Sequence, residues 1–318
     1  MGNGRSTLSA TGIIKSVKVS KYQSIKVSEC QSVKVSDTLT LISGVVMDFI
    51  EFLNYGFVQR AIIAGSFTAV LCSTLGMFLV LRRLSLIGDG LAHVTFGSVA
   101  VGLLLKVYPV YASIPIVLLS GYGIMKLMEK ARVYGDAAIG IVSAAGIASG
   151  VLIASVAGGF NIDLFSYLFG NILAISKEEV LLSATLSLVV IVIIMLFYHE
   201  LLSVTFDEDL AMVSGIKTKT VNTILILLTA ITVVLAMRVV GIMLVSALLI
   251  LPAVSAFQVA KGFKSAIAFS SIFSVLSVLT GIFVSFSWNL PTGATIVMLN
   301  IAIFMSMLFL KTFFAKRA

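Results

Sequence analysis

The sequence predicts an all-α, polytopic membrane protein, and three observations support this fold class. Apolar residues make up 59% of the 318 residues, charged residues make up only 11%, and the mean hydropathy is +1.13. A soluble domain needs a more polar surface than this composition can supply. From Met47 onward, the apolar residues also fall into stretches of about 17–25 residues, the length of a helix that crosses a bilayer core.

Nine such stretches are expected to span the membrane, with a merger of two of them as the alternative. In chain order they are residues 57–81, 85–107, 110–128, 137–157, 180–198, 221–237, 240–260, 265–287 and 292–310. Basic residues occupy alternate connections, at Arg82/Arg83, Lys126/Lys130/Arg132, Lys217/Lys219, Lys261/Lys264 and Lys311/Lys316/Arg317. Because cytoplasmic loops carry an excess of lysine and arginine, the N-terminus is predicted to lie outside and the C-terminus inside.

The formal net charge of +8 does not indicate a nucleic-acid-binding protein, because the basic residues lie between apolar stretches. The two cysteines, Cys30 and Cys72, are too few for a disulfide framework and lack the spacing of metal ligands. The sequence therefore predicts a lipid bilayer, and no nucleic acid, around this protein.

The first 46 residues differ from the rest of the chain. The pattern Ser-(Val/Ile)-Lys-Val-Ser recurs at residues 16–20, 24–28 and 32–36, without the apolar residues that a folded core needs. The segment also lacks the apolar run and small-residue cleavage site of a signal peptide. We expect residues 1–46 to be a disordered or non-native extension, with a small β-ribbon as the alternative. Residues 47–318 are expected to form the transmembrane domain.

Asp89 and His93 are ionisable residues in the otherwise almost uncharged second stretch. Residues four apart lie on the same face of a helix, so the carboxylate and the imidazole point the same way. An ionisable residue in a membrane helix costs about 2.5–3.5 kcal/mol on insertion scales and normally faces a partner, a cavity or a transport path. The pair therefore predicts half of a cation site. In the structural alternative, Asp89 caps the helix and His93 bonds a neighbouring helix.

The donor atoms of this pair suit zinc and manganese alike, whereas a thiolate would favour zinc or copper(I). Two ligands are too few for a tight tetrahedral site. Two copies of the chain that face a shared axis would supply four ligands, so a cation could bind there transiently. Protonation of His93 would remove a ligand, so metal binding is expected to weaken at acidic pH.

A short helix is expected on the cytoplasmic side, between the fifth and sixth stretches. Asp207 suits its N-cap, Glu208 and Asp209 suit its first turn, and Gly215 suits its C-terminal end. Taken alone, these signals favour a solvated linker helix over an element that docks a partner.

Five motifs, in the same order, resemble those of the zinc/manganese ABC importer permeases. They are RRLSLIGDGLAH at residues 82–93, GDAAIG at 135–140, YLFGNIL at 167–173, Phe206-Asp207 through Ala211 and Gly215, and residues 241–252, which end at Pro252. The resemblance covers the chain from Met47 to the C-terminus. Nothing in the first 46 residues matches.

The resemblance implies a homodimeric permease in the cell membrane of a bacterium or archaeon, with a helical fold like that of the vitamin B12 importer. It also implies two partners, a separate ATP-binding cassette ATPase and an extracytoplasmic metal-binding lipoprotein or periplasmic protein. Carried onto this chain, Asp89 and His93 become the metal-coordinating pair of the translocation path. The helix that couples the permease to the ATPase would include Phe206, Asp207, Glu208, Asp209, Ala211 and Gly215.

The expected function is therefore ATP-driven import of a divalent metal, with zinc favoured over manganese. The residues around the pair, Gly90, Val94 and Phe96-Gly97, look more like those of zinc-importing members. No permanently bound cofactor is implied, only the transported cation. The chain is expected to be a transporter permease and not an enzyme. ATP hydrolysis is expected on a separate subunit, because the chain lacks the Gly-x-x-x-x-Gly-Lys-Ser/Thr loop of an ATPase.

Other function classes remain as alternatives to a zinc importer. One is a manganese importer of the same family. Another is a secondary metal transporter, which would also place ionisable residues within the membrane. An intramembrane metalloenzyme is disfavoured because the chain has only two histidines and no His-Glu-x-x-His spacing.

Overall fold

The computed structural model describes residues 54–131, 134–157, 167–170 and 175–315, and these ranges contain helices and connections but no strand. The elements are α3 (Gly56–Leu81), α4 (Ile87–Leu104), α5 (Pro109–Lys130), α6 (Gly135–Val156), α8 (Lys177–Leu196), α9 (Tyr198–Phe206), α10 (Glu208–Val213), α11 (Thr218–Val239), η2 (Ile242–Leu244), α12 (Val245–Phe257), α13 (Phe263–Trp288) and α14 (Thr292–Ala315). Residues 1–46 lie outside the described ranges, so the expectation of a separate extension stays a prediction.

Eight helices of the described chain are long and apolar enough to cross a bilayer: α3, α4, α5, α6, α8, α11, α13 and α14. They correspond to eight of the nine predicted spans, with ends that differ by a few residues. Several helices expose large apolar side chains, such as Leu152, Leu181 and Met195, which suit contact with lipid rather than water. The all-α, polytopic fold class is confirmed.

The stretch at residues 240–260, predicted as a ninth span, forms a shorter helix. α12 has 13 residues and follows the 3-10 turn η2, so its axis is about 20 Å long, less than the ~30 Å of a hydrocarbon core. α11 cannot continue into it because Gly241 has a φ of +94°, a conformation that favours glycine. Nine full-length spans are thus not confirmed in the described chain.

The two ends of this short segment nevertheless lie at opposite ends of the helix bundle. Gly241 lies against the backbone of Gly170, close to the start of α14. At the other end of α12, Ala253 and Ala256 pack with Met77 of α3 and with the start of α13. The chain therefore runs across the bundle once between α11 and α13. The orientation of the termini relative to a membrane stays a prediction.

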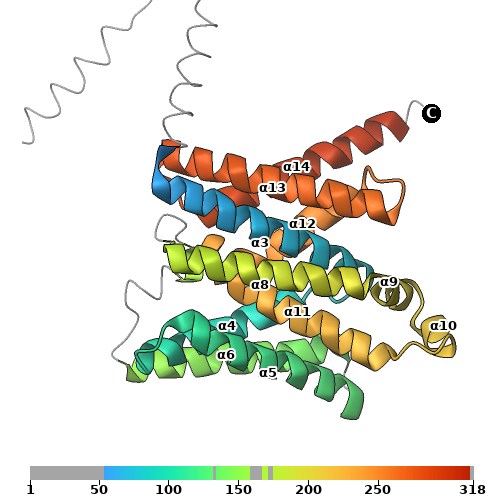
Figure 1. Ribbon diagram of the computed structural model, residues 1–318, viewed down its shortest axis with the longest axis horizontal. Coiled ribbons are helices and arrows are strands. Elements are labelled where there is room, and N and C mark those ends of the chain that lie inside the picture. Colours follow the sequence, from blue (N-terminus) through green and yellow to red (C-terminus); the bar gives the residue numbers. More distant parts are fainter. Residues whose placement is uncertain (1–53, 132–133, 158–166, 171–174, 316–318) are drawn as a thin grey trace, which may run out of the picture. The chain divides into compact units, whose positions relative to one another are not determined.

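One end of the bundle, called the basic end below, holds the last turns of α3 and α5 and the first turns of α11 and α13. Arg82, Lys130 and Lys264 lie there, and Figure 1 shows α9 and α10 at this end. The Phe263 ring packs against Phe78 of α3, with ring centroids 5.2 Å apart, and against α9. By the positive-inside rule, the basic end is the predicted cytoplasmic side.

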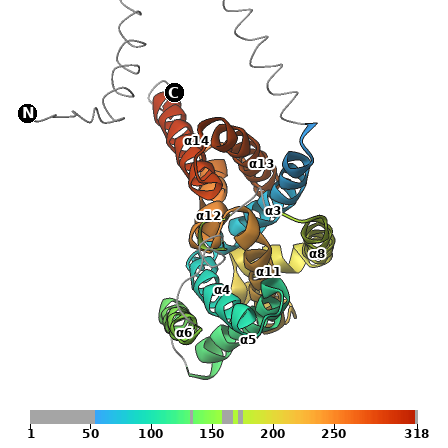
Figure 2. The same cartoon turned by 90° about the vertical axis from the view of Figure 1, so that its left-hand side faces the viewer.

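α4 is the most buried of the eight long helices, with 72% of its apolar span inside the protein, against 22% for α14. Figure 2 shows α4 beside α5, α6 and α12. Glycines let two of these neighbours approach closely. A Cβ atom on Gly88 would lie 2.5 Å from Leu249 Cδ1 of α12. A Cβ atom on Gly97 would lie 2.7 Å from the Gly146 carbonyl oxygen of α6. Such small-residue contacts drive helix association in membranes.

Gly146→Ala is expected to destabilise the protein, because the new methyl group would lie 2.7 Å from Val94 Cα, a backbone atom. Overpacking of this kind costs about 1–3 kcal/mol. Gly140→Ala in the same helix is the matched control, since nothing lies within 4 Å of its added Cβ. Thermal unfolding in detergent should show a lower midpoint for Gly146→Ala only. Equal midpoints for the two variants would contradict a close contact between α4 and α6.

Candidate metal site and the α10 surface helix

Asp89 and His93 lie in the first two turns of α4, near the basic end. His93 Nε2 is 3.4 Å from Asp89 Oδ2, as their spacing predicts. Asp89 Oδ1 accepts a hydrogen bond from Ser246 Oγ of α12 at 3.3 Å. Both distances exceed the typical hydrogen-bond length of about 2.7–3.0 Å. Neither contact therefore uses up the ability of the carboxylate or the imidazole to bind a cation.

The pair lies between α12 and α6 and is partly exposed in a single copy of the chain. The Asp89 side chain is 46% exposed and the His93 side chain is 20% exposed. His93 Nδ1 is buried and has no hydrogen-bond partner among the described residues. Buried ring nitrogens are usually bonded.

Neither part of the structural alternative for this pair is seen among the described residues. The N-cap of α4 is Leu86, which makes no side-chain cap bond, so Asp89 does not cap the helix. A bond to a neighbouring helix does exist, but it involves Asp89 and Ser246 instead of His93. No third Asp, Glu, His or Cys joins the pair within the part of the chain that the structure describes. One copy therefore offers an incomplete metal site.

α10 confirms the capping signals read from the sequence. Asp207 Oδ1 accepts a hydrogen bond from the Leu210 backbone N–H at 2.9 Å. At the C-terminal end, Gly215 has a φ of +88°, and its N–H bonds the Met212 carbonyl at 3.0 Å. The Ile216 N–H donates the second hydrogen bond of this Schellman motif, to the Ala211 carbonyl oxygen at 3.0 Å. α10 is therefore a short helix with both ends satisfied.

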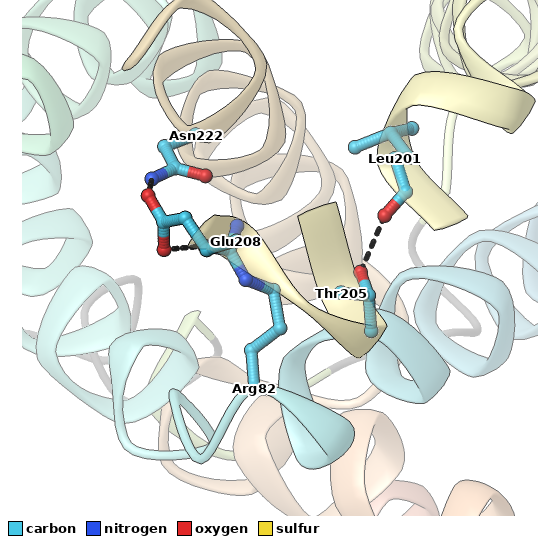
Figure 3. A network of polar contacts seen from close by, with 5 residues as sticks. All are labelled: Arg82, Leu201, Thr205, Glu208 and Asn222. Atoms are coloured by element: carbon cyan, nitrogen blue, oxygen red, sulfur yellow. Dashed lines mark hydrogen bonds and ion pairs between the residues drawn. The ribbon is translucent and has the colours of Figure 1, made fainter. Parts of the chain in front are cut away.

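Glu208 connects α10 to two other parts of the bundle (Figure 3). Its Oε2 atom accepts a hydrogen bond from Arg82 Nη2 at 3.2 Å, and its Oε1 atom accepts one from Asn222 Nδ2 at 2.9 Å. Arg82 follows α3, and Asn222 lies near the start of α11. The Arg82 side chain is only 9% exposed. Burial lowers the pKa of Arg82, and the negative charge of Glu208 opposes this shift.

Comparison with known proteins identifies the family of this chain. The sequence pattern of the ABC 3 transport family matches residues 54–311. The chain belongs to this family. As an ABC 3 transport protein it is a multi-pass permease of the cell membrane and not an enzyme.

Relatives within the family are named for two metals. The manganese transport system membrane protein MntC of Halalkalibacterium halodurans is 30% identical over 83% of this chain and 90% of that protein. The high-affinity zinc uptake system membrane protein ZnuB of Haemophilus influenzae is 30% identical over 78% of this chain and 95% of that protein. The solved structure of PsaBC from Streptococcus pneumoniae in complex with Fab matches with 31% identity and a TM-score of 0.72, over 82% of this chain and 95% of that one. The family therefore does not decide between zinc and manganese.

The sequence of this ABC 3 family protein did not predict the partners of Asp89 and Arg82. Ser246 comes 157 residues after Asp89, and Glu208 comes 126 residues after Arg82. Sequence reasoning also missed the buried Glu179 of α8, which accepts a hydrogen bond from the Tyr108 hydroxyl. Glu179 forms a capping box with Ser176, and the Ser-x-x-Glu spacing was a readable signal for that half of its role.

Asp207→Ala is expected to fray α10, because the Leu210 N–H loses its acceptor. Loss of an N-cap costs about 1 kcal/mol, so hydrogen exchange of the α10 amides should accelerate about fivefold in the purified full chain. Asp207→Asn is the matched control, since it keeps a side-chain oxygen at this position. Equal exchange rates for Asp207→Ala and the wild type would contradict the capping role.

Proposed function

We propose that this chain is the permease of an ATP-driven importer of a divalent metal, with zinc as the substrate and manganese as the second candidate. The observation that carries this proposal is the Asp89–His93 pair, a carboxylate and an imidazole 3.4 Å apart on one buried membrane helix. Both donor types bind both cations. Membership of an ABC transport family supports ATP as the source of energy.

Two copies of the chain are proposed to complete the metal site. In one copy the pair is partly exposed, and its two polar contacts are long. A second copy with the same pair across a shared axis would raise the number of protein ligands to four. Because the ligands are only lightly held, a cation could exchange between the two pairs without breaking strong hydrogen bonds. This suits a cation that stops briefly and then moves on.

The two candidate metals would use such a site differently. Zinc is satisfied by four ligands, so two carboxylates and two imidazoles would complete its shell. Manganese prefers more oxygen ligands in an octahedral arrangement. The Ser246 hydroxyl, 3.3 Å from Asp89, and water could supply further oxygens. The residues around the pair look more like those of zinc-importing members of the family. Relatives such as MntC, in contrast, are named for manganese transport.

α10 is proposed to contact the ATPase. Leu210, Met212 and Val213 are each more than half exposed, and Ala211 is the one buried residue of α10. Apolar side chains on a capped helix at the basic end favour a protein partner over a solvated linker. An extracytoplasmic metal-binding protein is the second proposed partner, and it would deliver the metal to the opposite end of the bundle.

Lipid vesicles that contain the full chain, its ATPase and its metal-binding partner should take up zinc when ATP is supplied. Vanadate should stop the uptake, because the proposed energy source is ATP hydrolysis. Competition between zinc and manganese, each in excess over the other, identifies the preferred substrate. Uptake that is driven by a proton gradient in the absence of the ATPase would overturn the proposal and support a secondary transporter.

Asp89→Ala and His93→Ala should each abolish metal uptake and leave a folded protein. Loss of a metal ligand should cost more than the roughly 10–100-fold cost of losing an outer-shell partner. His199→Ala is the matched control, because His199 is an exposed histidine of α9 outside the pair. Wild-type uptake by folded Asp89→Ala and His93→Ala proteins would exclude the pair from the transport path.

Ala211→Pro should disconnect the ATPase from transport. Proline removes the Ala211 N–H, which bonds the Asp207 carbonyl oxygen at 3.1 Å, and its ring disrupts the helix. The ATPase should then fail to co-purify, or its hydrolysis should no longer respond to metal. Zinc binding to the permease should be unchanged. Normal association together with normal metal stimulation would show that α10 does not couple the two subunits.

A further inference from the structure

We propose that Glu208 is a positioning residue that ties α10 to the turn before α4, so that movement of α10 reaches Asp89 and His93. The proposal rests on the function proposed above, in which α10 meets the ATPase and the Asp89–His93 pair meets the metal. It concerns the physical link between these two places in one chain.

Glu208 is the main side-chain attachment of α10. Within the described residues, it is the one α10 side chain that hydrogen-bonds other helices or their connections. The cap by Asp207 is local to α10 and gives it shape, not a fixed place on the bundle. The two bonds of Glu208 use both carboxylate oxygens, as Figure 3 shows. A displacement of α10 must therefore either break these bonds or carry their partners along.

Breaking the bond to Arg82 is unfavourable because its side chain is buried. An ion pair between two exposed side chains contributes little. Here the Arg82 side chain is only 9% exposed, although Glu208 is 44% exposed. Removal of Glu208 would leave a buried guanidinium without its counter-charge, which is much costlier than loss of a surface pair. Arg82 is therefore expected to move with Glu208.

The turn between α3 and α4 is too tightly bonded to absorb such a movement. Arg83 takes the left-handed conformation with a φ of +56°. The Leu84 N–H donates a hydrogen bond to the Leu79 carbonyl oxygen, near the end of α3, at 2.9 Å. The Leu84 carbonyl in turn accepts a hydrogen bond from Ile87, the first residue of α4, at 3.0 Å. A shift of Arg82 therefore passes into the first turn of α4, which holds Asp89. Asn222 offers a second route, because α11 also packs against α4.

The test compares Glu208→Gln with Glu129→Gln in vesicles that hold the full chain and its two partners. Glu129→Gln is the matched control, since Glu129 is an exposed acid at the same end of the bundle. Glu208→Gln should lower the metal transported per ATP hydrolysed by about tenfold, the factor that corresponds to an interaction free energy within the range found for neighbouring side chains. ATPase binding and ATP hydrolysis should persist. Glu129→Gln should behave as the wild type.

Charge exchange tests the pair itself. Arg82→Gln should reproduce the loss seen in Glu208→Gln, whereas Arg83→Gln, at the exposed neighbouring arginine, should not. The double variant Arg82→Glu/Glu208→Arg should recover transport, because the pair re-forms with reversed charges. Asn222 Oδ1, which is buried without a partner among the described residues, could then accept from the new arginine. A wild-type transport ratio in Glu208→Gln, or loss of ATPase binding by this variant, would overturn the proposal.

Hydrogen exchange separates failure of this link from failure of the proposed function. If Glu208 ties α10 to the turn before α4, Glu208→Gln should accelerate exchange at residues 84–93 in the purified full chain, and Glu129→Gln should not. Unchanged exchange at these residues would overturn the link whatever the protein transports. A wild-type chain that transports neither zinc nor manganese would contradict the proposed function alone.

Discussion

Close packing of neighbouring helices against α4 is the constraint on which the rest of this structure depends. In a bilayer, apolar side chains gain little by leaving lipid for protein, so helices associate through close packing and polar contacts. Gly97 leaves no room for a side chain against the backbone of α6, and Gly88 lies against the Leu249 side chain of α12. α4 is therefore held on two sides, and Asp89 and His93 keep a defined place between these neighbours. A larger residue at Gly97 would therefore displace the helix that carries the candidate metal ligands.

The polar contacts of Asp89 on α4 differ in kind from those of Glu208 on α10. The contacts of Asp89, to His93 and Ser246, are 3.3–3.4 Å long and leave the donor atoms available. The contacts of Glu208 include a 2.9 Å bond to Asn222 and an ion pair with the buried Arg82. Weak contacts suit ligands that must exchange a cation, whereas a compensated buried charge suits a lasting mechanical link. The same helix can thus carry a permissive site and be positioned from a surface helix.

Much of the fold could be predicted because its causes are local. A membrane helix can be recognised by the length and apolar composition of its own sequence, so eight spans were located to within a few residues. The ends of α10 were predicted from Asp207 and Gly215 because capping involves residues a few positions apart. The stretch at residues 240–260 was wrongly predicted as a full span because the prediction used only such local properties. Its composition suits a full span, but Gly241 takes a positive φ where it lies against the backbone of Gly170.

The sequence by itself determined the class of the protein, most of its membrane helices and the placement of Asp89 and His93 on one helical face, since each follows from composition or short-range spacing. Only the tertiary structure decided that Ser246 contacts Asp89 and that Arg82 and Asn222 bond Glu208. These partners come from other parts of the bundle, and two of them are more than a hundred residues away along the chain. A hydrogen bond depends on distance in space, and a single sequence records only distance along the chain.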